Sequence, residues 1–142
     1  MIMPKLLVVA FHQEGLTYVE RAMVLGMDVR VLDCVDNYHH QLTAWYGDNV
    51  LQVQGRRADV KERVMEEKFD AAIIQEDLDF VRAALITQSL REAGVRQIIV
   101  VTPDPMKRSM YRRCGAHRVV VAANEEQAWT ALEHYLPTYV SA

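Results

Sequence analysis

Short apolar runs alternate with longer segments of helical periodicity along the whole chain. Such runs predict β-strands, with the bounds Lys5–Phe11, Asp28–Asp33, Val50–Val53, Ala71–Ile74, Gln97–Val101 and Arg118–Val121. The first run is continuously apolar, which is typical of a strand covered by helices on both faces. The second run alternates more clearly, so we expect one of its faces to be less covered. Strands separated by helices predict βαβ units and a parallel sheet.

A helix is predicted after each of these runs. The bounds are Leu16–Leu25, Asp36–Tyr46, Asp59–Glu67, Asp77 or Asp79 to Gly94, Pro105–Cys114 and Glu125–Tyr135. The predicted apolar face of the first helix consists of Leu16, Val19, Ala22 and Met23. Six strands and six helices in strict alternation predict an α/β fold, a Rossmann-like doubly wound six-stranded parallel sheet in three α/β/α layers.

The chain length and the sheet type predict where a ligand binds. A length of 142 residues fits one domain over residues 1–142. Ligands of doubly wound sheets bind outside the carboxyl ends of the strands, at the switch in strand order. The candidate site therefore consists of the loops after Ala10, Asp33, Val53 and Ile74.

Composition and charge exclude several classes of function. The chain is 51% hydrophobic and 25% charged, with a net charge of −3, which argues against non-specific attraction to nucleic acid or anionic lipid. No stretch is long enough to span a membrane, and Met1–Lys5 leads into a strand without a signal-peptide layout, so we expect a cytoplasmic protein. Cys34 and Cys114 form no CxxC pair, and His39–His40 is expected in a solvated loop, so no metal site is predicted.

The turn after the first strand holds the first candidate cofactor-binding residues. A dinucleotide fingerprint has glycines at its first, third and sixth positions, for a tight turn, close approach of pyrophosphate and helix packing. Those positions are Ala10, His12 and Gly15 here. The His12 ring is bulky where pyrophosphate would meet bare backbone, and Glu14 adds negative charge at a helix N-terminus. We therefore predict a tight connection that holds pyrophosphate weakly or not at all.

Asp33, Arg56, Arg57 and Gln75 complete the set of candidate cofactor-binding residues. An acid at the end of the second strand can bind the hydroxyls of a ribose, although a turn aspartate has the same sequence signature. Arg56 and Arg57 follow the third strand, where they can hold an anion bidentately or form a solvated loop paired to nearby acids. If a nucleotide binds, we expect its phosphates to be displaced towards these two arginines.

Two further charged segments have structural interpretations that we favour. Three acids after Gln75, at positions 76, 77 and 79, complement the N-terminus of the long helix, and the alternative is acid–base chemistry or a divalent cation. A basic segment contains Lys107, Arg108, Arg112 and Arg113. It is expected to be a solvated face, and the alternative is a surface for an acidic partner.

The order of these motifs resembles the N-terminal domain of regulators of potassium conductance, the RCK or TrkA-N type. The resemblance covers nearly the whole chain, and its best segment is Met110–Val121, which is similar to a family ending of the form Leu-x-x-x-Gly-Ala-Asp-x-Val-Val. The chain departs from the family pattern in the glycine motif. It also has Arg56 in place of an acid and Val101 in place of a basic residue.

The resemblance implies a regulatory module rather than an enzyme. Domains of this type bind NAD(H) or adenine nucleotides, form homodimers and regulate a potassium channel or transporter, here a separate membrane chain. The departures imply that NAD(H) or an adenine nucleotide binds in an altered way, weakly or not at all, or that the domain is structural. The last helix carries an apolar stripe that is either core or dimer interface, consisting of Ala128, Trp129, Leu132 and Tyr135 or Leu136. A small Rossmann-fold enzyme with His12 as a base and Asp33 or Glu76 as its partner is the alternative.

Overall fold

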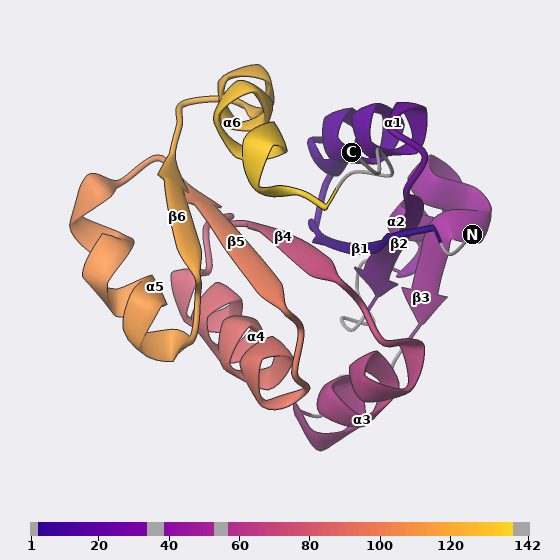
Figure 1. The fold of residues 1–142 in the computed structure, drawn as a ribbon, viewed down its shortest axis with the longest axis horizontal. Coiled ribbons are helices and arrows are strands. Elements are labelled where there is room, and N and C mark those ends of the chain that lie inside the picture. Colours follow the sequence, from indigo (N-terminus) through magenta and orange to yellow (C-terminus); the bar gives the residue numbers. More distant parts are fainter. Residues whose placement is uncertain (1–2, 34–38, 53–56, 138–142) are drawn as a thin grey trace.

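A single six-stranded parallel sheet runs through the molecule, in the strand order β3-β2-β1-β4-β5-β6 (Figure 1). The computed structural model describes residues 3–33, 39–52 and 57–137. The strands are β1 (Lys5–Val9), β2 (Asp28–Asp33), β3 (Val50–Gln52), β4 (Ala71–Gln75), β5 (Gln97–Thr102) and β6 (Arg118–Val121). Every pair of neighbours is parallel. The predicted Rossmann-like, doubly wound fold is confirmed.

The helices form a layer on each side of the sheet (Figure 1). They are α1 (Gly15–Val24), α2 (His39–Tyr46), α3 (Arg57–Glu67), α4 (Phe80–Glu92), α5 (Arg108–Cys114) and α6 (Glu125–Leu132). The first, second and sixth helices pack on one face, and the other three pack on the opposite face. This arrangement confirms the three-layer prediction. Within the described residues, no helix is long and apolar enough to cross a bilayer.

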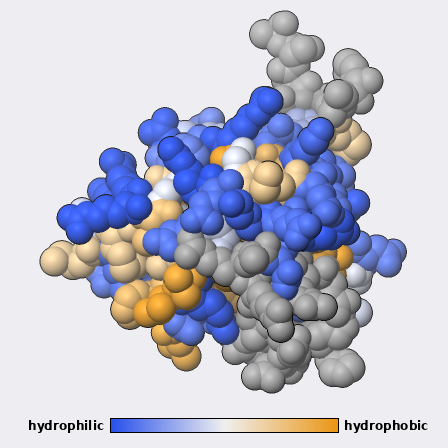
Figure 2. Space-filling view, turned by 90° about the horizontal axis from the view of Figure 1, so that it is seen from below, coloured by the Kyte–Doolittle hydropathy of each residue, from blue (hydrophilic) through white to orange (hydrophobic). Residues whose placement is uncertain are grey.

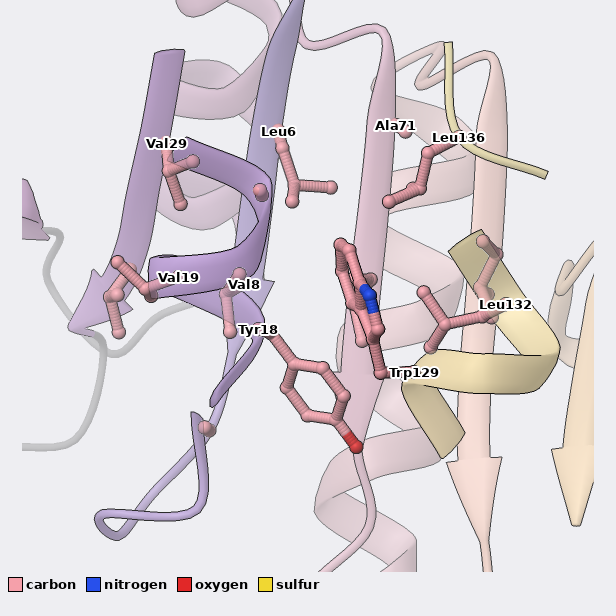
Figure 3. Close-up of a cluster of buried hydrophobic side chains, with 14 of the residues drawn as sticks. Leu6, Val8, Tyr18, Val19, Val29, Ala71, Trp129, Leu132 and Leu136 are labelled. Atoms are coloured by element: carbon pink, nitrogen blue, oxygen red, sulfur yellow. The ribbon is translucent and has the colours of Figure 1, made fainter. Parts of the chain in front are cut away.

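Two hydrophobic cores, one on each face of the sheet, follow from the continuous apolar runs of the strands. Figure 3 shows the core under α1 and α6, where Tyr18 and Trp129 lie next to each other above β1 and β4. Both strands are fully covered, since Leu6 to Val9 and Ala71 to Ile74 are all inaccessible to solvent. The sheet interior therefore leaves only its ends for function.

The buried face of α1 differs from its prediction. Met23 is 52% exposed, and Tyr18 is buried together with Val19 and Ala22. The helix lies beside α6 as well as on the sheet, and Arg21 pairs with Glu126 across that contact. A helix with two packed sides buries adjacent residues, which a single-face periodicity does not predict.

The apolar stripe of the last helix is core rather than a free surface. Ala128, Trp129, Leu132 and Leu136 are all buried within the same chain. Tyr135 instead lies at the surface, with the Arg118 guanidinium 4.5 Å from the centre of its ring. This stripe therefore gives no support to the homodimer prediction.

Several helix starts also differ from the prediction. Asp59 lies in the first turn of α3, which already begins at Arg57. His39 and His40, expected in a loop, are the first two residues of α2, while Asp36, Cys34 and Val53 lie outside the described residues. Pro105 opens a short 3-10 turn, capped by the Asp104 side chain, before α5 begins.

Candidate functional site

The switch in strand order lies between β1 and β4, which are neighbours in the centre of the sheet. The chain leaves β1 towards β2 and leaves β4 towards β5, so the two connecting segments separate above the carboxyl ends of these strands. The β1–α1 turn, the end of β2 at Asp33 and the end of β4 at Gln75 all lie at this edge. Most of the predicted site residues are therefore brought to the same edge of the sheet.

Tyr46, at the end of α2, closes the β1–α1 turn. Its hydroxyl donates to the backbone carbonyl of His12 at 2.6 Å. The same hydroxyl lies against Gly15, where an added Cβ would be 2.5 Å from it. Burial and the nearby Glu14 raise the pKa of Tyr46, so it is a neutral donor at physiological pH. The Tyr46 side chain thus covers the start of α1.

Gly15 is present because no side chain fits at its position. A Cβ there would lie 2.5 Å from the Tyr46 hydroxyl and 2.7 Å from the Ala10 Cβ. Ala10 is itself fully buried, whereas the His12 side chain is exposed. Gly15, the one glycine of the motif that remains, therefore leaves the space that the Tyr46 side chain needs. Packing alone explains why a glycine occupies this position.

Glu14 places a carboxyl group beside the N-terminus of α1. It occupies the N-cap position without making a side-chain cap hydrogen bond. Burial raises its pKa above the ordinary value, and the carboxylates of Glu125 and Asp77 contribute in the same direction, while His12 opposes them. An anionic ligand at this turn would add to an already negative environment.

Asp33 and Gln75 lie on either side of the first turn, at the ends of β2 and β4. Asp33 is only 2% exposed and is opposite Gln52 in the register with β3. The Gln75 side chain accepts a hydrogen bond from the Tyr18 hydroxyl at 2.5 Å. Burial, with Glu125 and Glu14, raises the pKa of Tyr18. The Gln75 carboxamide oxygen is therefore already bonded to α1.

Arg82, in the first turns of α4, supplies positive charge beside the first turn. Its guanidinium lies 3.9 Å from the centre of the Phe11 ring. It also bonds the Asp77 carboxylate at 2.5 Å. Asp77 in turn accepts the Asp79 backbone N–H, and Asp79 caps α4 by accepting the N–H of Arg82. The cap interpretation is confirmed for Asp79.

Glu76 has a different role from the helix cap that we predicted. Its side chain is 4% exposed and accepts hydrogen bonds from Lys107 Nζ at 2.6 Å and from the Tyr111 hydroxyl at 2.7 Å. Lys107 also lies 4.6 Å from the centre of the Phe80 ring. Burial and the Glu76 carboxylate raise the pKa of Tyr111. Lys107 is therefore part of a partly buried ion pair and not of a solvated basic face.

Comparison with solved structures identifies the fold. The NAD(P)-binding domain of an exopolyphosphatase-related protein from Archaeoglobus fulgidus has a TM-score of 0.63 and 20% identity, covering 92% of this chain and 98% of that one. The TrkA-N domain of the inner membrane protein ybaL from Escherichia coli has a TM-score of 0.62 and 20% identity, covering 94% and 97%. The chain has the TrkA-N fold. No protein-family model and no curated sequence matches it.

A longer protein shares the same TrkA-N fold over part of its length. The GsuK RCK domain has a TM-score of 0.63 and 16% identity, covering 84% of this chain and 26% of that chain. At these identities the likeness concerns the path of the backbone and not the side chains at the site. The site of this TrkA-N fold therefore has to be interpreted from its own residues.

Two predicted residues fall partly or wholly outside the described part of the chain. Arg56 lies outside the described residues, and Arg57 is the first residue of α3, with its side chain undescribed. The acid considered as a partner for His12, Glu76, is bonded to Lys107 and Tyr111 instead. The acid that interacts electrostatically with His12 is Glu14.

Sequence reasoning missed Tyr46 and Arg82, which define the geometry of the first turn. An aromatic residue at the end of a predicted helix has no local signature of a contact 34 residues away. Arg82 is one basic residue within a long helical segment. The only sequence signal for its place at the site is that it follows Asp79 by three residues, because an N-cap acid bonds the backbone N–H of the residue at that position.

Proposed function

We propose that this chain is a regulatory nucleotide-sensing module whose site holds the ribose end of an adenine nucleotide but not a dinucleotide pyrophosphate. The single observation that carries the proposal is the Tyr46 hydroxyl, which bonds the His12 carbonyl and lies against Gly15 at the start of α1. Helix N-terminal amides bind phosphate only when they are accessible. Residues 1–142 would act as one domain, in the cytoplasm, on a separate membrane channel or transporter chain.

The structural neighbours support a nucleotide as the ligand. One is an NAD(P)-binding domain, and GsuK has been solved bound to NAD and bound to ADP. The corresponding edge of this sheet has the buried acid Asp33 at the end of β2, where a ribose would lie. The Glu14 carboxyl group at the N-cap of α1 and the Tyr46 hydroxyl against Gly15 argue against pyrophosphate in the first turn.

Titration calorimetry with NADH, NAD⁺, ATP, ADP and cyclic dinucleotides tests the proposal. We expect an adenine mononucleotide to bind more tightly than NAD(H). An NADH complex with its pyrophosphate over residues 12 to 15 would contradict the proposed geometry. If none of these ligands binds, the proposed nucleotide-sensing role is wrong, and a purely structural role of the domain remains.

Replacing Asp33 by alanine tests the ribose end of the site. If Asp33 binds ribose hydroxyls, Asp33→Ala weakens nucleotide binding by roughly 1–3 kcal/mol, because a charge-assisted hydrogen bond is lost and its partner is left unpaired. Calorimetry on both proteins measures the difference. Equal affinities would show that Asp33 is only a turn residue. Asp28→Ala, at the opposite end of the same strand, is the matched control.

Glu14 predicts a pH dependence of NAD⁺ binding. Because burial raises the pKa of Glu14, the folded chain keeps this proton to a higher pH than an exposed glutamate does. Residual affinity for NAD⁺ should therefore rise as the pH is lowered below neutral and the Glu14 carboxylate is neutralised. Glu14→Gln should raise the affinity at neutral pH by about 1 kcal/mol, or roughly fivefold.

Parallel titrations of wild type and Glu14→Gln at several pH values test whether Glu14 is the source of this pH dependence. The variant should lose most of the pH dependence. A variant that keeps the full dependence would show that Glu14 is not its source.

An exposed apolar patch supports the expectation of a homodimer. It lies on the α3–α4–α5 side, which Figure 2 views from below, and consists of Leu78, Phe80, Val81, Leu85 and Met106. Leu78 is fully exposed and Met106 is 87% exposed. Contiguous apolar side chains of this kind on a soluble domain mark an interaction surface, and a second copy of the chain offers a matching one.

Light scattering on the wild type should give a dimer mass at concentrations on the order of tens of micromolar. Val81→Glu/Leu85→Glu should give a monomer, because each charge would be buried in the interface. Met65→Glu, at a similarly exposed position on α3, should leave the mass unchanged. A wild-type mass that is monomeric at every concentration would contradict the homodimer.

A further inference from the structure

A groove of about 420 Å³ opens where the last turns of α4 and α5 meet. These turns lead into β5 and β6, so the groove lies at the amino ends of the strands, opposite the candidate nucleotide site. Three guanidinium groups line it, from Arg91, Arg112 and Arg113, together with one carboxylate from Glu92. We call it the arginine groove. Its volume falls in the range of small-molecule sites.

Helix dipoles explain part of this charge but not all of it. Arginines in the last turn of a helix complement the negative C-terminal end of its dipole, which is equivalent to about half a charge. The arginine groove lies at two such ends, those of α4 and α5. Three full positive charges exceed these two half-charges and Glu92 together. The salt bridges found among the described residues include none of the three arginines.

Arg91 packs closely against Gly115, the left-handed C-cap residue of α5. Gly115 has φ 118°, and a Cβ there would lie 2.6 Å from the Arg91 Cβ. The Arg91 guanidinium also donates to the Gly115 carbonyl at 3.3 Å. A basic side chain that only balanced a helix dipole could remain mobile in solvent. This one is held in a defined position.

His117 makes a contact with Arg91 that lacks an acceptor. The His117 Nδ1 accepts the backbone N–H of Ile98 at 3.0 Å, so the proton of the neutral ring is on Nε2. That Nε2 lies 2.6 Å from an Arg91 nitrogen, which is also a donor. Burial and Arg91 both lower the pKa of His117, which is consistent with a neutral ring. An anionic oxygen near these groups would accept from both donors.

We propose that the arginine groove binds a small phosphorylated anion of the diphosphate class. Guanidinium groups bind phosphate oxygens bidentately, and three arginines line a space of suitable size here. Arg91 would bind one phosphate group of this anion, while Arg112 and Arg113 would bind the second. This site goes beyond the proposed nucleotide site, because it lies at the other edge of the sheet.

Inorganic pyrophosphate is the probe, and two readouts on the full chain detect its binding. Calorimetry measures its affinity, and alkylation of Cys114, which lines the groove, measures its location. Mass spectrometry counts modification of Cys114 separately from Cys34. We expect saturable binding below about 10 mM and slower alkylation of Cys114 in its presence.

The Arg112→Ala/Arg113→Ala variant should weaken pyrophosphate binding by about tenfold or more. Arg108→Ala, an exposed arginine on the same helix outside the groove, is the matched control and should stay within about twofold. Asp33→Ala should bind pyrophosphate as the wild type does, so failure of the nucleotide proposal and failure of this one are distinguishable. Circular dichroism verifies that each variant is folded.

Three results would overturn the proposal. One is the absence of binding and of Cys114 protection at about 10 mM pyrophosphate. Another is an affinity of the double variant equal to that of the Arg108→Ala control. The third is citrate binding as tightly as pyrophosphate, which would identify a general carboxylate or ionic-strength effect rather than recognition of phosphate.

Discussion

Gly15→Ala should destabilise the chain by about 3 kcal/mol, although alanine favours helices more than glycine does. The added Cβ would overlap the Tyr46 hydroxyl and the Ala10 Cβ, at 2.5 and 2.7 Å. The second neighbour is part of the fully buried end of β1 and has little room to move. Relaxation would therefore break the Tyr46 hydrogen bond to His12. Urea unfolding measures the loss, with a fall of the thermal midpoint on the order of 10 °C.

Gly47→Ala is the control for this substitution. Gly47 has φ 56°, and a Cβ added there would have no neighbouring atom within 4 Å, so its replacement adds only the strain of a left-handed backbone, about 1 kcal/mol. Tyr46→Phe removes one of the two overlaps, so Gly15→Ala should cost less in that background. A Gly15→Ala variant as stable as Gly47→Ala would show that α2 does not close the first turn.

Lys107→Met should destabilise the chain by about 3 kcal/mol, at the lower end of the range for breaking a buried ion pair. The substitution leaves Glu76, with 4% of its side chain exposed, bonded only to the Tyr111 hydroxyl among the two donors described. Lys107 is itself 27% exposed, so water would compensate part of the loss. Guanidinium unfolding of both proteins gives the difference.

Arg108→Met is the matched control, because the residue is exposed and adjacent in sequence. It should change the free energy of unfolding by less than about 0.5 kcal/mol. The double variant Glu76→Gln/Lys107→Met should recover part of the loss, since no buried charge remains without its partner. Equal stabilities of Lys107→Met and Arg108→Met would show that the pair contributes nothing.

The architecture could be predicted from the sequence because each buried strand is marked by its own continuous apolar run. The run at β1 is apolar at every position that the sheet buries, and β5 is similar over Ile98 to Val101. Helix ends followed from local chemistry too. Asn124 is the N-cap of α6, where its side chain accepts the Gln127 N–H, and Gly94 follows α4 with φ 81°. Interactions between near neighbours in sequence are what a pattern can encode.

The candidate site could be predicted only to the level of an edge of the sheet. Asp33 and Gln75 reach that edge because their strands end there. The contact of Tyr46 with the first turn depends on how α2 packs on β2 and β3. The pairing of Glu76 with Lys107 joins residues 31 positions apart. Such contacts depend on packing between elements, which the spacing of residues along the chain does not specify.

The central position of β1 has a consequence for synthesis on the ribosome. One side of β1 pairs with β2, and the other side pairs with β4. Leu6 can therefore pair with Ala71 only after β4 has been synthesised. Until about the first half of the chain has emerged, the edge of β1 that later pairs with β4 stays open. The strand that carries this open edge has an uninterrupted apolar sequence. Edge strands of this kind associate readily with other chains. Nascent chains halted before Gln75 should therefore bind chaperones strongly, and chains halted after Gln75 should be released.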